Sequence, residues 1–128
     1  MDSGPIRSHR DLIVWQKAMD LVEEVYRLAS RLPAHEAYRL VAQLTKAATS
    51  VPANIAEGRA RSSRKEYAWF VSVAKGSLME TDTFLAIGQR LGYLNADQLT
   101  TAIDLIGEVS KMLTALRSRL ISRQDSNL

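Results

Sequence analysis

Glu57 and Glu80 are the acidic residues of this sequence that most suggest a carboxylate site. Paired carboxylates can bind metal ions, but a di-metal centre of the ferritin type needs Glu-x-x-His motifs projecting inward from two helices. The only histidines are His9 and His35, neither follows such a glutamate, and His35 lies in an expected loop exposed to solvent. The sequence has no cysteine. We therefore expect no metal site and no cofactor.

Other catalytic patterns are equally weak. The sequence has no phosphate-binding P-loop and no glycine-rich dinucleotide turn. Its serines form no arguable Ser-His-Asp arrangement. We therefore expect no catalytic residue and no enzymatic activity.

A line of polar residues runs through the segment that includes SVPANIAEG, residues 50–58. Gln43, Ser50 and Glu57 are spaced by seven residues, so they share one side of a helix, with Asn54 between the last two. Pro52 cannot donate a backbone hydrogen bond, so a kink is expected, with the freed carbonyl group of residue 48 seeking a donor. The Asn54 amide is a candidate for that donor.

An antiparallel hairpin folded about residue 60 would place Gln43 level with Ser77 and Glu80, far from Glu57. Glu57 could pair with Arg61 one helical turn away. Two interpretations stay open, namely a carboxylate site and a polar set that fixes helix register. We favour the second, whose members are Gln43, Asn54, Glu57, Ser77 and Glu80.

Basic residues gather in three segments of the chain. The run RARSSRK, residues 59–65, holds four cations and no anion. In a four-helix bundle of alternating direction, the chain start, the second connection and the chain end meet at one end, here called the basic pole. Its members are Arg7, Arg10, Arg59, Arg61, Arg64, Lys65, Arg117, Arg119 and Arg123.

The basic pole has two interpretations. Arginine forks suit phosphate, so we expect RNA or DNA to be recognised through backbone or shape. No aromatic residue interleaves the basic run, so base stacking is not expected. The alternative is a solvated helix end, whose cations complement the helix dipole.

Length and composition fit one compact domain. The chain has 128 residues, 46% of them hydrophobic, and a net charge of +3. No stretch resembles a signal peptide, and none approaches the roughly 18 apolar residues of a membrane span. We expect a cytoplasmic protein without a membrane partner.

Four helical segments must position these side chains. Apolar residues recur every three or four positions over residues 11–31, 35–57, 64–91 and 96–121. Ser8, Ser63 and Asn95 are expected N-caps, whereas Gly58 and Gly92 are expected just past helix ends. Short connections favour an all-α, antiparallel up-down-up-down four-helix bundle over residues 11–121, with tails at 1–10 and 122–128.

Two helices carry apolar or small residues beyond one stripe. Val14, Leu21 and Leu28 lie beside the main stripe of the first helix, whose members are Trp15, Ala18, Val22, Val25, Ala29 and Leu32. The third helix carries small residues on one side, which could admit another helix; they are Ala74, Ser77, Thr81 and Gly88. Surplus apolar surface usually marks a partner interface, so a homo-oligomer is expected. A splayed bundle with wider buried stripes is the alternative.

Four stretches carry a family resemblance. They are DLIVWQKAMDLVEEVY (11–26), LPAHEAYRLVAQLTKAATSVPANIAEG (32–58), SRKEYAWFVSVAKGSLMETDTFL (63–85) and LGYL (91–94). Together they resemble the bacterial four-helix bundle proteins encoded within intervening sequences of large-subunit ribosomal RNA genes. The elements that match most specifically are residues 54–58 and 76–80.

The resemblance implies an antiparallel four-helix bundle assembled as a homopentamer. The family is similar in fold to the accessory protein of diversity-generating retroelements, a basic pentameric barrel that binds nucleic acid and a reverse transcriptase. It supplies no catalytic residue. We therefore expect a non-enzymatic oligomer that binds RNA or DNA through the basic pole. The alternative is an adaptor ring that binds a protein partner and has no affinity for nucleic acid.

Overall fold

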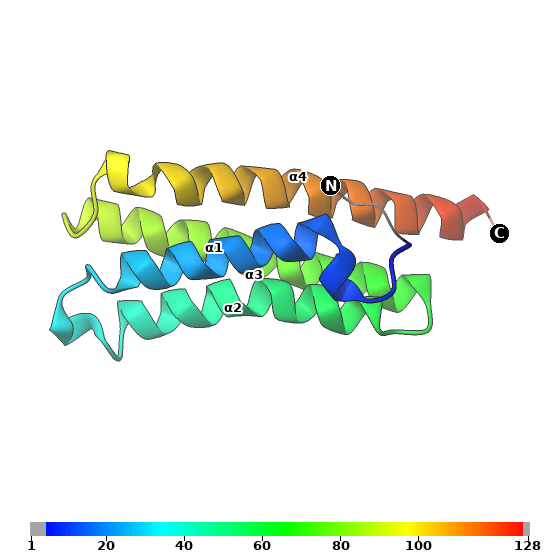
Figure 1. Cartoon of the computed structure of the whole chain (residues 1–128), viewed down its shortest axis with the longest axis horizontal. Coiled ribbons are helices and arrows are strands. Elements are labelled where there is room, and N and C mark those ends of the chain that lie inside the picture. Colours follow the sequence, from blue (N-terminus) through cyan, green and yellow to red (C-terminus); the bar gives the residue numbers. More distant parts are fainter. Residues whose placement is uncertain (1–4, 127–128) are drawn as a thin grey trace.

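The chain folds into four long helices and two short 3-10 turns (Figure 1). The computed structural model describes the backbone of residues 5–126 and the side chains of residues 5–122. In chain order the elements are η1 (His9–Asp11), α1 (Ile13–Ala29), η2 (Ala34–Glu36), α2 (Leu40–Arg59), α3 (Arg64–Arg90) and α4 (Ala96–Ser126).

The helices pack as a four-membered bundle. Each long helix contacts its neighbour in the chain, and α1 also contacts α4, whereas α1 with α3 and α2 with α4 form no contacting pairs among the described residues. The helices alternate in direction, as Figure 1 shows. The predicted all-α class and four-helix architecture are confirmed. In the described part of the chain, no helix is both long and apolar enough to cross a membrane.

Most of the predicted N-caps are present, but one caps a different element. Ser63 accepts a hydrogen bond from the backbone of Glu66 at 3.0 Å, and Asn95 exchanges two with Gln98 at 2.9 Å each. Ser8 forms a capping box with Asp11, yet it caps η1 and not α1. The Asp11 carboxylate accepts from the backbone N–H groups of residues 7 and 8, which lowers its pKa.

Three predicted helix limits were wrong. Residues 34–36 form η2 after Pro33, so α2 begins at Leu40 and not at residue 35. Gly58 lies inside α2, where close packing, not a left-handed turn, explains the glycine. The last helix continues to Ser126 through most of the expected tail at 122–128, whose last two residues lie outside the described range. Gly92, at φ 82°, confirms the predicted end after α3.

The core uses both lines of α1, because Ala18, Val25 and Ala29 of the expected main stripe are buried together with the line predicted to be surplus. Val14, Leu21 and Leu28, predicted to be surplus, are buried, whereas Trp15 and Val22 are only partly buried. The small residues of α3 were also misassigned. Ala74, Ser77, Thr81 and Gly88 are all buried within the bundle, so their size serves packing inside one chain.

A polar cluster joins the two connections at the end opposite the basic pole. The Tyr93 hydroxyl donates to Glu36 Oε2 at 2.9 Å, and exposed His35 lies 3.3 Å from that hydroxyl. This hydrogen bond lowers the pKa of Glu36 and raises the pKa of Tyr93. The cluster ties η2 to the segment between α3 and α4.

Candidate nucleic-acid interface

The segments that carry the basic pole lie at one end of the bundle. In Figure 1, the N-terminal segment, the connection between α2 and α3, and the end of α4 lie together at the right. Arg59 ends α2, whereas Arg64 and Lys65 begin α3. Arg123 is part of α4, but its side chain lies outside the described residues. The topology therefore brings the predicted basic segments together.

Three arginines of the basic pole are held by partners within the chain. Arg10 lies over the ring of Trp15, 5.5 Å from its centroid. Arg61 forms an ion pair with Glu57, as predicted, and lies over the ring of Phe70. Arg117 Nε donates to the Ser72 hydroxyl at 2.6 Å. These contacts fix the guanidinium groups and, for Arg61, neutralise part of the charge.

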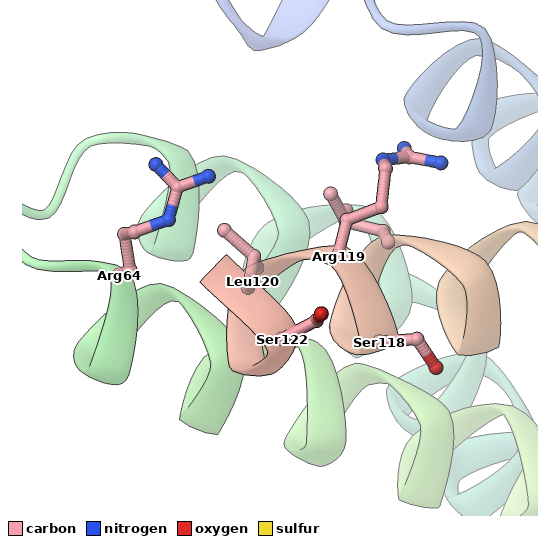
Figure 2. A pocket seen from close by; sticks show the side chains of 6 residues that line it. Arg64, Ser118, Arg119, Leu120 and Ser122 are labelled. Carbon is pink, nitrogen blue, oxygen red and sulfur yellow. The ribbon is translucent and has the colours of Figure 1, made fainter. Parts of the chain in front are cut away.

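Arg64 and Arg119 line an open groove between the start of α3 and the last turns of α4 (Figure 2). The two arginines lie on either side of Leu120 and extend their guanidinium groups to the same side. The groove has a volume of about 690 Å³ and is mostly apolar; its other lining residues are Leu116, Ser118 and Ser122. We name it the α3–α4 groove.

The Nε atom of Arg64 is buried and has no hydrogen-bond partner among the described residues. A buried donor without an acceptor is unfavourable by roughly 1–3 kcal/mol. The side chain as a whole is half-buried. It therefore combines a charged tip with this buried donor, which an acceptor could reach only after the side chain turns.

Two cations of the basic pole, Arg59 and Arg119, lie close to Tyr67. Burial of the Tyr67 ring raises the pKa of its hydroxyl, whereas the positive charges of Arg59 and Arg119 act in the opposite direction. This effect requires both cations near the ring. Arg59, Tyr67 and Arg119 thus link the end of α2 to the α3–α4 groove.

The predicted polar set falls into two groups. Ser50 and Ser77 share a hydrogen bond of 2.8 Å between α2 and α3. The Asn54 amide donates to the backbone oxygen and the hydroxyl of Ser50, at 2.8 and 2.9 Å. The prediction that the Asn54 amide donates to the carbonyl group of residue 48 was therefore wrong. Helix α2 continues without a break through Pro52.

Gln43 lies next to Glu80 but not level with Ser77. Together with Lys46 and Ser50, Gln43 and Glu80 line a cavity of about 150 Å³ between α2 and α3. Glu57 is not part of its lining and pairs instead with Arg61. The carboxylates of Glu57 and Glu80 therefore do not share a site. Among the described side chains, no three His, Asp or Glu residues form a group that could hold a metal ion.

Sequence analysis missed the apolar part of the α3–α4 groove. Leu116 and Leu120 are spaced by four residues, and Arg117 and Arg119 lie between them in the sequence. One helix therefore supplies both the apolar floor and the charge. The groove lining includes Ser122, which lies just beyond the expected end of the last helix at residue 121. Continued helical periodicity was the signal that could have revealed it.

Comparison with known proteins gives the family. The family model for the 23S rRNA-intervening sequence protein matches residues 10–115. A solved structure of a protein of unknown function from the S23 ribosomal protein family of Bacteroides thetaiotaomicron is similar, with a TM-score of 0.76. The two chains are 22% identical over 82% of this chain and 98% of the other, so this likeness concerns the fold. No curated protein matches. The chain belongs to the 23S rRNA-intervening sequence protein family.

Proposed function

We propose that this protein is a non-enzymatic, oligomeric bundle protein that binds RNA or DNA through its basic pole. The observation that carries the proposal is the pair Arg64 and Arg119, which flank an open groove at that pole while the Arg64 Nε atom has no acceptor among the described residues. Guanidinium groups bind phosphate with two parallel hydrogen bonds. Release of counterions from the nucleic acid would supply affinity that does not depend on sequence.

A charge-reversal variant tests this proposal. Arg59, Arg61, Arg64 and Lys65, all replaced by Glu, should abolish binding of a mixed RNA and DNA pool measured by fluorescence anisotropy at low salt. The matched control reverses four exposed cations that lie outside the basic pole, namely Arg31, Arg39, Lys46 and Arg90. The control carries the same change in net charge, so it should retain most of the affinity. Equal loss in both variants, or no binding by the unchanged protein, would overturn the proposal.

The same proposal includes assembly as a homopentamer, which the family resemblance implies. An apolar groove between α1 and α2, and single exposed apolar side chains on α3 and α4, support self-association. Between α1 and α2 lies a groove of about 350 Å³ whose lining includes Trp15, Met19 and Pro52. On the α3–α4 side, Trp69 is 61% exposed and Ile103 is 50% exposed. Unlike surfaces on opposite sides favour head-to-tail contacts, which can close into a ring.

An acidic surface supports the second candidate, an adaptor that binds a protein. Asp20, Glu23, Glu24, Asp104 and Glu108 line a groove of about 520 Å³ between α1 and α4, with Arg27 as the only cation of its lining among the described residues. Such a surface suits a basic protein partner. This second function is supported if the unchanged protein binds no nucleic acid at moderate salt and a basic protein is recovered together with it. Replacing Asp104 and Glu108 with Lys should then abolish recovery.

A further inference from the structure

The α3–α4 groove has features that phosphate binding alone does not require. Its floor is made by Leu116 and Leu120, and its apolar lining exceeds its polar lining. A surface that only contacts the phosphates of a duplex can be polar throughout. The volume of about 690 Å³ lies within the roughly 300–1,000 Å³ typical of ligand sites. An apolar floor between two cations calls for a ligand with both apolar and anionic parts.

We infer that this groove binds single-stranded nucleic acid, with an unpaired base on the leucine floor and the flanking phosphates on Arg64 and Arg119. The inference rests on the proposed function and names the form of nucleic acid that the basic pole selects. In a duplex, the faces of the bases are stacked and cannot reach such a floor. In a single strand they are free to contact apolar side chains and guanidinium planes. Base contact thus adds to the backbone recognition expected from the basic run.

Arg64 lies at the edge of the groove, and one donor in its side chain is unpaired within the described part of the chain. Its Nε atom is buried at the edge of the groove without an acceptor among the described residues. A phosphate in the groove would accept from the terminal nitrogens of the guanidinium group, and a turn of the side chain that exposes Nε would allow the two-pronged geometry, in which two oxygens accept from two nitrogens. Arg119, beyond Leu120, extends its guanidinium group to the same side (Figure 2). One strand could therefore contact both arginines while a base covers the floor between them.

The first experiment compares three probes of equal length at one salt concentration. They are an unstructured uridine oligomer, a perfect RNA duplex, and an oligomer with the same phosphates but abasic sugars. We expect the unstructured oligomer to bind about tenfold more tightly than either of the others, measured by fluorescence anisotropy. A duplex that binds as tightly as the single strand, or an abasic strand that matches it, overturns the inference.

The second experiment fills the groove without changing charge. Ser122 is exposed and lines the groove, so Ser122→Phe should cover the leucine floor. We expect it to weaken binding of the uridine oligomer about tenfold and to leave duplex binding unchanged. Ala115→Phe is the matched control, because Ala115 is exposed on α4 and does not line the groove. An equal effect of both variants, or none from Ser122→Phe, contradicts the inference.

The third experiment counts phosphate contacts. Arg64→Gln and Arg119→Gln should each lower the slope of log affinity against log salt by about 0.7, the value for one phosphate on a single strand. Arg90→Gln, at the opposite end, should leave the slope unchanged.

The outcomes separate the two proposals. If the unchanged protein binds duplex and single strand alike and Ser122→Phe has no effect, the inference fails while the proposed function stands. If the unchanged protein binds no nucleic acid, both fail.

Discussion

The polar side chains between α2 and α3 are connected through one residue, Ser50. Its hydroxyl meets Ser77 on α3, and both its hydroxyl and its backbone oxygen accept from the Asn54 amide. The network bridges α2 and α3 at a part-buried position. Side-chain hydrogen bonds at such a place are sensitive to register, because a shift of one residue would separate the two serines.

Asn54→Leu should therefore destabilise the bundle. It removes two hydrogen bonds of 2.8 and 2.9 Å and leaves the Ser50 hydroxyl with Ser77 alone. We expect a loss of about 1–3 kcal/mol in the free energy of unfolding, measured with urea. Gln43→Leu, at an exposed position of the same helix, should change it by less than about 0.5 kcal/mol. Unchanged melting and unchanged oligomer size for Asn54→Leu would show that Asn54 is not a structural residue.

Sequence analysis identified these polar residues but not all their partners. It placed Gln43 opposite Ser77 because it centred the hairpin near residue 60. The observed pair, Ser50 with Ser77, centres it between residues 63 and 64. Helix α2 runs two residues further than expected, to Arg59, and the turn follows it. Helical periodicity predicts which residues share a side, but the register between helices depends on where the turn lies.

Helices α2 and α3 pack closely around Gly58. A Cβ atom on this residue would lie 2.8 Å from Phe70 Cβ and 3.3 Å from the backbone oxygen of Tyr67. Neither atom can move without shifting α3. The glycine therefore allows close packing of the two helices, although sequence analysis interpreted it as a helix end.

Two alanine substitutions separate packing from helix propensity. Gly58→Ala should destabilise the protein, because overpacking costs about 1–3 kcal/mol and a propensity gain of about 1 kcal/mol offsets only part of this. Gly76→Ala is the matched control in α3, where a new Cβ would meet nothing within 4 Å, and it should stabilise by about 0.4–1 kcal/mol. Urea unfolding measures both. A stabilising Gly58→Ala would contradict the close approach of α2 and α3.

The two apolar lines of α1 show that helical periodicity does not predict how much of a helix is buried. The line with Val14, Leu21 and Leu28 and the line with Trp15 and Val22 have the same helical spacing. Helix α1 packs between α2 and α4, and the first line faces the interior. Trp15 and Val22 instead line the groove beside α2. Ala18, Val25 and Ala29 of the second line are buried as well, so spacing alone could not give the width of the buried face, which depends on where the neighbouring helices lie.

The arrangement of the whole bundle explains which larger features could be predicted. Short connections require alternating helices, and alternation brings the first segment, the second connection and the last helix to one end. The basic pole therefore followed from the order of elements. The α3–α4 groove did not, because it depends on how α3 and α4 pack against each other and on which side chains line the space between them.

If the α1–α2 groove and the exposed apolar side chains of α3 and α4 form the contacts between chains, a charge placed on either side should prevent assembly. Met19→Lys places a charge in the α1–α2 groove, and Ile103→Lys places one on the α3–α4 side. In the proposed pentamer every contact uses both surfaces, so each variant should reduce the mass measured by light scattering from five times the 14.3 kDa chain to that of one chain. Tyr38→Lys is the control, since Tyr38 is 97% exposed and should leave the mass unchanged.

Mixing the two charged variants tests the direction of the contact. The Met19→Lys chain keeps its α3–α4 surface, and the Ile103→Lys chain keeps its α1–α2 groove. One intact contact can therefore form between them, and the ring cannot close. An equimolar mixture should give a dimer, whereas each variant alone stays a monomer. If both surfaces instead paired with their own kind, each variant alone would form a dimer through its unchanged surface, and head-to-tail assembly would be excluded.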